Sequence, residues 1–142
     1  MLVQKVLRMY AAELLSAEIE ATLTVDKSMR ELGIGEVVVD PSRLLQVLIN
    51  VLTNAIKFTK DRPRKEITIS VSASVERPVS DKHGVAFIEP RDTIREKPAL
   101  SEDLIDLPDI FLQFAVEDTG RGLNEKEMEV LFRRFRQGSA KT

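Results

Sequence analysis

The sequence has 142 residues, of which 43% are apolar, as is typical of one globular domain with a sizeable core. Its 21 lysines and arginines nearly balance 23 acidic residues, so we expect no partnership with nucleic acid or an anionic membrane. The absence of cysteine excludes disulfides and thiolate metal sites, and no apolar run is long enough for a signal peptide or a membrane span. We therefore expect a cytoplasmic location.

The first forty residues change their hydrophobic period twice. Apolar side chains recur at helical spacing over about the first fifteen residues, which predicts an amphipathic helix. Residues 20–26 then alternate between apolar and polar, which predicts a half-buried strand. Three consecutive valines at 37–39, following the glycines at 33 and 35, predict a short second strand.

A long helix is predicted from residue 42 to about residue 59. Asp40 is a good N-cap and Pro41 suits the first helical position. Most of the circumference is apolar, so we expect the helix to be largely buried. A single polar stripe, spaced by three or four residues, interrupts it: Arg43, Gln46, Asn50, Asn54 and Lys57.

The two asparagines of this stripe indicate a lined cavity rather than plain surface. Asparagine is a poor helix former, and a solvent-facing stripe more often carries glutamate and lysine. Amide oxygens are hard neutral donors that suit magnesium, and a lysine one turn further on can neutralise phosphate. The alternative is that Asn50 and Asn54 simply cap neighbouring loops.

Beyond the helix, alternation over residues 67–75 predicts a strand of the antiparallel type, and residues 111–117 predict another. Residues 76–109 carry prolines and many charges without a sustained period, which predicts an exposed, flexible insertion between the two strands. The lone His83 falls in this insertion, where a solvated loop residue is a simpler interpretation than a catalyst. Residues 125–135 have a helical pattern.

An aspartate and two glycines follow the last predicted strand. Asp118 stands at the strand end, and Gly120 and Gly122 allow a tight turn and close approach of a ligand. A buried carboxylate accepts hydrogen bonds only, so it could receive the exocyclic amine of adenine. The alternative is an ordinary turn in which Asp118 caps the next helix.

Taken together and in this order, these segments resemble histidine kinases, in the style of fungal hybrid kinases. Residues 40–59 resemble the N box, 117–123 the first glycine box, and 131–135 the F box. The resemblance implies the α+β fold of this ATPase superfamily, a two-layer sandwich of a mixed, mostly antiparallel sheet with helices on one face. It also implies ATP and Mg²⁺ as cofactors, with site residues Asn54 and Asn50 at the metal, Lys57 at phosphate, Asp118, Gly120, Gly122 and Phe58 around adenine, and Phe132 and Phe135 anchoring the ATP lid.

The same resemblance implies transfer of phosphate rather than hydrolysis. Hydrolytic relatives carry a glutamate four residues before the metal asparagine, whereas this chain has Asn50, and an amide cannot accept a proton from water at neutral pH. The expected phosphate acceptor is a histidine on a separate dimerisation domain, and the next partner is a response-regulator receiver domain. Neither is expected within residues 1–142.

The resemblance also predicts an incomplete domain. The lid would begin at 124 and the chain would stop inside it at 142, before the second glycine box, so we expect residues 1–142 to form a partial ATP-binding domain that is inactive alone. The other hypothesis from the sequence is a degenerate fragment that acts as an interaction module.

Overall fold

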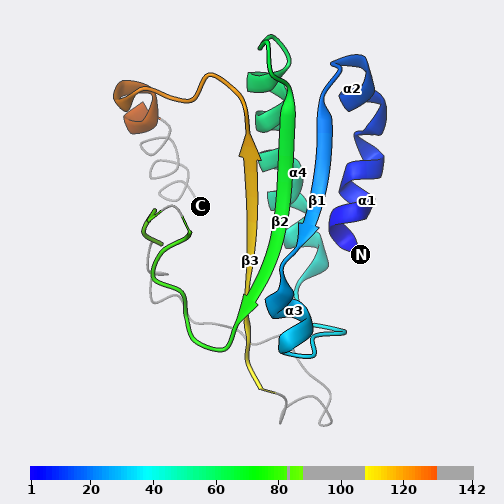
Figure 1. Cartoon of the computed structure of the whole chain (residues 1–142), viewed down its shortest axis with the longest axis vertical. Coiled ribbons are helices and arrows are strands. Elements are labelled where there is room, and N and C mark those ends of the chain that lie inside the picture. The colour runs from blue at the N-terminus through cyan, green and yellow to red at the C-terminus, as the bar shows by residue number, and fades with distance from the viewer. Residues whose placement is uncertain (83, 88–107, 131–142) are drawn as a thin grey trace.

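The computed structural model describes residues 1–82, 84–87 and 108–130. Within them, β1 (Glu20–Val25), β2 (Glu66–Ser74) and β3 (Phe111–Asp118) form one sheet in the order β1-β2-β3 (Figure 1). β1 pairs with β2 in parallel, and β2 pairs with β3 antiparallel. The predicted mixed sheet of an α+β fold is therefore confirmed.

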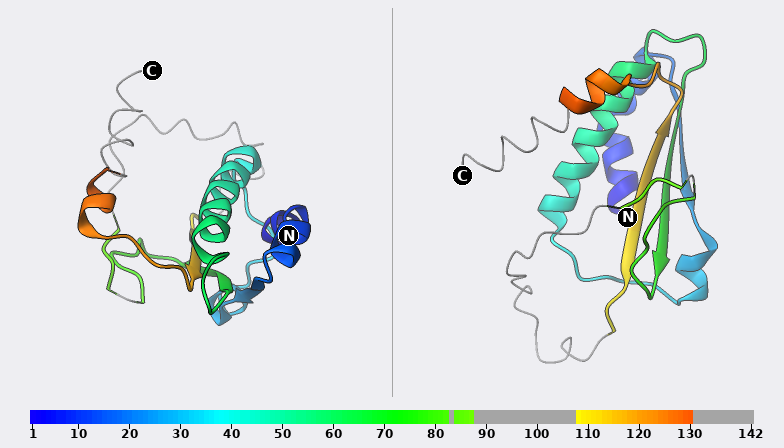
Figure 2. Two further views of the ribbon diagram at one scale, coloured as in Figure 1. Left: turned by 90° about the horizontal axis from the view of Figure 1, so that it is seen from above. Right: turned by 90° about the vertical axis from the view of Figure 1, so that its left-hand side faces the viewer.

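Helices cover one face of this sheet. The long helix α4 (Pro41–Thr59) and the N-terminal helix α1 (Leu2–Met9) lie on the same face, and α2 (Ala11–Ser16) continues from α1 (Figure 2). The core between the layers is aliphatic, and its fully buried large side chains are Leu52, Ile67, Ile69, Val3 and Val6. Burial of each such side chain contributes about 1.5–3 kcal/mol. No helix in the described ranges combines the length and apolarity that crossing a bilayer requires.

Helix α4 begins as predicted but is less buried than expected. The Asp40 carboxylate accepts hydrogen bonds from the N–H groups of Ser42 and Arg43 at 3.1 and 3.3 Å, which caps the helix. The expectation of a largely buried helix is wrong, because Val47 and Val51 are 57% and 41% exposed. The sheet covers only one side of α4, so an apolar flank next to the polar stripe stays open.

Two predictions for the N-terminal third are also wrong. The expected single helix is divided at Tyr10, and the two short helices each turn apolar side chains onto β1. Residues 37–39 form no strand and all three valines are exposed, because β propensity has no effect without a neighbouring strand to pair with. A five-residue helix that was not predicted, α3 (Lys27–Glu31), precedes them and is capped by Asp26.

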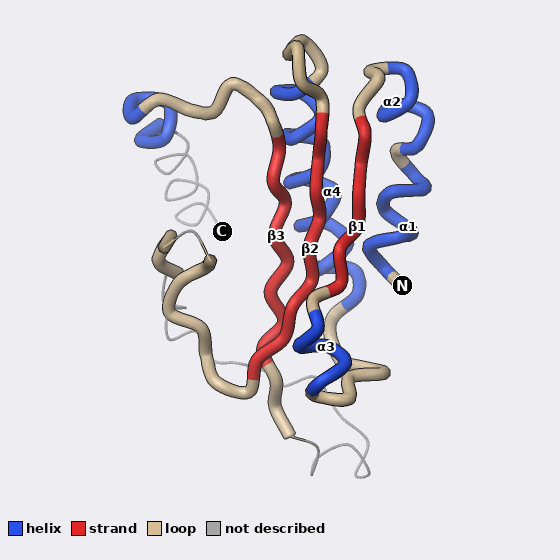
Figure 3. The backbone as a smooth tube through the Cα atoms, in the orientation of Figure 1, coloured by secondary structure: helices blue, strands red, loops and turns tan. Residues whose placement is uncertain are grey.

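The predicted insertion does connect two neighbouring strands, since β2 and β3 pair directly. Its first part returns to β3: Lys82 Nζ lies 2.8 Å from a carboxylate oxygen of Glu117, and the Arg77 guanidinium lies 5.6 Å from the centre of the Phe111 ring. Residues 125–130 form a helix that lies beyond β3, on the side away from β1 (Figure 3). His83 and residues 88–107 and 131–142 lie outside the described residues.

Candidate functional site

The polar stripe of α4 is exposed along its whole length. Asn50, Asn54 and Lys57 are all accessible, and their spacing of four and three residues places them on one side of the helix. Within the described ranges, neither amide side chain is hydrogen-bonded to a neighbouring loop. The described residues therefore give no support to the interpretation in which both asparagines are loop caps.

The turn after β3 is organised by Asp118. Its carboxylate accepts a hydrogen bond from the N–H of Gly120 at 2.8 Å. The expectation of a buried carboxylate is wrong, because Asp118 is exposed at the end of the last strand of the described sheet. Asp118 does not cap the next helix either. Asn124 does so, accepting from the N–H of Glu127 at 2.9 Å.

Close packing brings this turn against the C-terminal end of α4. A methyl group on Gly120 would lie 2.9 Å from the carbonyl oxygen of Phe58 and 3.2 Å from its carbonyl carbon. Only a residue without Cβ allows this approach. Phe58 is four residues, or about one turn, after Asn54, so Asn54 and the aspartate turn lie at the same end of α4.

Thr119 holds the turn to the sheet and was not singled out from the sequence. Its hydroxyl donates to the carbonyl of Arg64 at 2.6 Å and accepts from the N–H of Glu66 at 3.0 Å. Its own N–H donates to the carbonyl of Glu66 at 3.1 Å. These bonds span more than fifty residues of sequence, and no local pattern could have predicted them.

The sequence also did not predict a cluster of charged side chains around the Phe58 ring. The Arg121 guanidinium lies 5.4 Å and Lys57 Nζ 5.6 Å from the centre of the ring. Arg121 makes two hydrogen bonds to the carboxylate of Glu127, at 3.1 and 3.0 Å. Arg121 therefore lowers the pKa of Glu127, and Glu127 in turn raises the pKa of Arg121. The one sequence signal was the capping-box spacing of Asn124 and Glu127.

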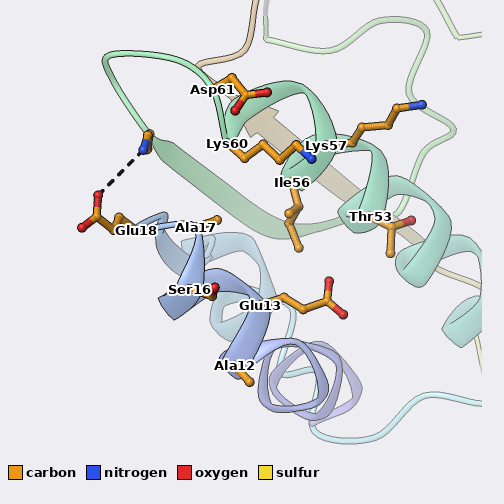
Figure 4. A pocket seen from close by; sticks show the side chains of 11 residues that line it. Ala12, Glu13, Ser16, Ala17, Glu18, Thr53, Ile56, Lys57, Lys60 and Asp61 are labelled. Carbon is orange, nitrogen blue, oxygen red and sulfur yellow. Dashed lines mark ion pairs between the residues drawn. The ribbon is translucent and has the colours of Figure 1, made fainter.

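A hollow among the described residues lies on a different flank of α4. It has a volume of about 710 Å³ and lies between α2 and the C-terminal half of α4 (Figure 4). Its walls carry both signs of charge: Lys57, Lys60 and Lys65 against Glu13, Glu18 and Asp61. Of the predicted site residues only Lys57 lines it, so this hollow is not the predicted nucleotide site.

Gly122 has a φ of +72°, and a Cβ there would meet nothing within 4 Å. This left-handed conformation favours glycine, in agreement with the tight turn predicted from the sequence. The predicted lid residues Phe132 and Phe135 lie outside the described residues. No group of three or more histidine, cysteine, aspartate or glutamate side chains that could hold a metal is found in the described ranges.

Comparison with known proteins gives a family match over residues 39–142, to the model described as histidine kinase-, DNA gyrase B- and HSP90-like ATPase. The chain is also 33% identical over 110 residues to the virulence sensor protein BvgS of Bordetella pertussis, which covers 76% of this chain and 6% of that protein. The BvgS proteins of Bordetella bronchiseptica and Bordetella parapertussis are 32% identical over 110 residues, with the same coverage. The chain thus spans about 6% of the length of these relatives.

Proposed function

Because the chain belongs to the family of histidine kinase-, DNA gyrase B- and HSP90-like ATPases, we propose that it is the ATP-binding domain of a two-component histidine kinase. In this proposal it binds Mg-ATP and presents the γ-phosphate to a histidine on a separate dimerisation domain, from which it passes to a receiver domain. The domain works in the cytoplasm, where ATP is supplied.

The observation that carries the proposal is the close approach of Gly120 to the Phe58 carbonyl, at the end of α4 that also bears Asn54. Two segments about sixty residues apart in sequence, one with amide oxygens and a lysine and the other with an exposed carboxylate, meet there. Adenine would meet Asp118, Phe58, Gly120 and Gly122, and the phosphates would meet Lys57. Each end of a nucleotide thereby has groups of suitable chemistry.

The residues present also fit a magnesium ion. Asn54 and Asn50 offer exposed amide oxygens one turn apart, and such hard neutral donors would suit Mg²⁺. When bound, the ion would neutralise charge on the phosphates. Lys57 would share this role from the next turn of the helix.

Transfer to a protein acceptor is favoured over hydrolysis by Asn50. A neutral amide at this position cannot take a proton from an attacking water, so no residue of the α4 stripe acts as a general base for hydrolysis. The domain would then act by positioning and by charge neutralisation. Steady release of inorganic phosphate from Mg-ATP, without an acceptor, would overturn this part of the proposal.

The test is calorimetric binding of a non-hydrolysable ATP analogue with and without magnesium. Loss of a charged hydrogen bond costs about 1.5–3 kcal/mol, so Asp118→Asn should weaken binding roughly tenfold to a hundredfold. Asn54→Ala should remove most of the magnesium dependence. Gln46→Ala, which lies on the same stripe two turns earlier, is the matched control and should bind normally. A wild-type domain that binds no adenine nucleotide, even when extended through the second glycine box, would refute the proposal and leave the interaction module as the better hypothesis.

A further inference from the structure

Arg121 connects the turn after β3 and the helix that follows it to α4, which is distant in sequence. It belongs to the turn after β3, its guanidinium lies 5.4 Å from the centre of the Phe58 ring of α4, and it is bonded to Glu127 of helix 125–130. Nothing in the proposed nucleotide chemistry uses Arg121 or Glu127. A side chain that contacts two other elements can fix how they are placed relative to each other.

On the lid side, Glu127 is itself held by the first turn of its helix. Its carboxylate accepts from the N–H of Asn124 at 3.0 Å, while its own N–H donates to the Asn124 side chain at 2.9 Å. This reciprocal pair is a capping box, which fixes where the helix starts. Because one Glu127 oxygen serves both Asn124 and Arg121, Arg121 is tied to the helix start and not merely to a loose side chain.

On the α4 side, Arg121 meets a ring whose backbone is already fixed. The carbonyl of Phe58 lies against Gly120, next to Arg121 in the chain. A guanidinium is planar, so it can stack on an aromatic ring and still donate two parallel hydrogen bonds to a carboxylate. Lysine cannot do both, because its ammonium group is a point charge without a flat face.

The geometry points to Arg121 as a positioning residue that sets the start of the ATP lid over the C-terminal end of α4, with Glu127 as its anchor. This inference rests on the proposed function, because the space between these elements is where the nucleotide would lie. Arg121 shapes that space through Phe58 and the lid helix without contacting the transferred phosphate. Exposed ion pairs alone usually contribute little, and the contact with Phe58 distinguishes this one.

The first experiment is hydrogen exchange on the full chain without nucleotide. Arg121→Lys keeps the positive charge but loses the planar guanidinium and its two parallel N–H donors. Glu127→Gln keeps the capping box but loses the negative charge. Both should speed exchange of the amides at 125–130 by about threefold to tenfold, with little change in the global unfolding midpoint. Arg64 and Glu66 form a second exposed arginine–glutamate pair, with a hydrogen bond of 2.9 Å, so Arg64→Lys and Glu66→Gln are matched controls that should change nothing at 125–130.

The second experiment is phosphoryl transfer from Mg-ATP by the domain extended through the second glycine box, with a histidine-bearing acceptor domain supplied. Arg121→Lys should raise KM for ATP by about threefold to tenfold and leave kcat within about twofold, since binding geometry changes but the transferred group does not. A merely structural role would instead reduce the folded fraction, lowering apparent kcat with KM unchanged. Equal effects from the Arg64→Lys control would also overturn the inference.

The two proposals fail in different ways. If the wild type binds no ATP analogue, the proposed function is wrong, and the exchange experiment still decides whether Arg121 holds helix 125–130. If the wild type binds normally while Arg121→Lys and Glu127→Gln match it in exchange and in KM, the positioning role is wrong and the proposed function stands.

Discussion

Gly120→Ala tests directly whether the aspartate turn packs on α4. The new methyl group would lie 2.7 Å from an Asp118 carboxylate oxygen, 2.9 Å from the Phe58 carbonyl oxygen and 3.2 Å from its carbonyl carbon. The carboxylate can rotate, but the Phe58 backbone lies in the last turn of a 19-residue helix and cannot yield cheaply. Overpacking of this kind typically costs about 1–3 kcal/mol. We expect a loss of unfolding free energy in that range and a displaced Asp118.

Two other glycines separate this steric effect from backbone strain. Gly33 has a φ of +64° and Gly122 a φ of +72°, and a Cβ on either would meet nothing within 4 Å. Alanine there should cost about 1 kcal/mol through its left-handed conformation alone. Gly33 lies far from the site in sequence and is a control for stability without ligand binding.

The assay is urea denaturation of the three variants, combined with calorimetry of the ATP analogue. With a slope of about 1–3 kcal/mol/M, Gly120→Ala should lower the urea midpoint by roughly 1 M. It should also weaken nucleotide binding at concentrations where the protein is fully folded, whereas Gly33→Ala should leave binding unchanged. If Gly120→Ala unfolds at the wild-type midpoint and binds normally, the turn does not pack on α4 and the reasoning behind the site fails.

Other predictions follow from hydrogen bonds and charges. The buried Thr59 hydroxyl has no hydrogen-bond partner among the described residues, so Thr59→Val should raise the free energy of unfolding by about 1 kcal/mol in urea denaturation. Thr119→Val should lower it by about 1–3 kcal/mol, because the Glu66 N–H loses its bond to the hydroxyl. Removal of the α4 cap by Asp40→Ala should cost about 1 kcal/mol, measured in the same way. Because the folded-state pKa of Glu127 lies below its ordinary value of 4.5, its contribution to stability is present above pH 4.5 and is lost as the pH falls through the folded value. The effect is local to helix 125–130, so Glu127→Gln should flatten the acid dependence of amide protection at 125–130, and an unchanged dependence would contradict the ion pair.

The sequence predicted the elements whose signals are local and repeated. Helix α4 has both a cap and five turns of pattern, and β2 alternates over nine residues, so their predicted boundaries match within one residue. Helix α3 was missed because five residues are too short to show a helical period. The strand predicted at residues 37–39 was wrong because three valines carry strand propensity but no information about a pairing partner.

In the candidate site, too, some features could be predicted from the sequence and others could not. Asn50, Asn54 and Lys57 could be placed on one side of a helix from spacing alone. The approach of Gly120 to Phe58, the bonds of Thr119 to Arg64 and Glu66, and the contact of Arg121 with Phe58 are tertiary. They depend on how β3 is placed beside α4, which no local period encodes.

On the exposed flank of α4, apolar and polar side chains lie side by side in an arrangement that suits the proposed ligand. At 100° per residue, Val47, Val51 and Phe58 form a strip between the amide stripe and the buried face. Phe58 meets the turn after β3, so this strip faces the β3 side, where Phe114 and Val116 are only partly buried. A nucleotide has an apolar flat base joined to a hard anionic tail, and α4 presents an apolar strip directly beside a row of amides and an ammonium group. The prediction of a largely buried helix was wrong at the positions where a base would need exposed apolar surface.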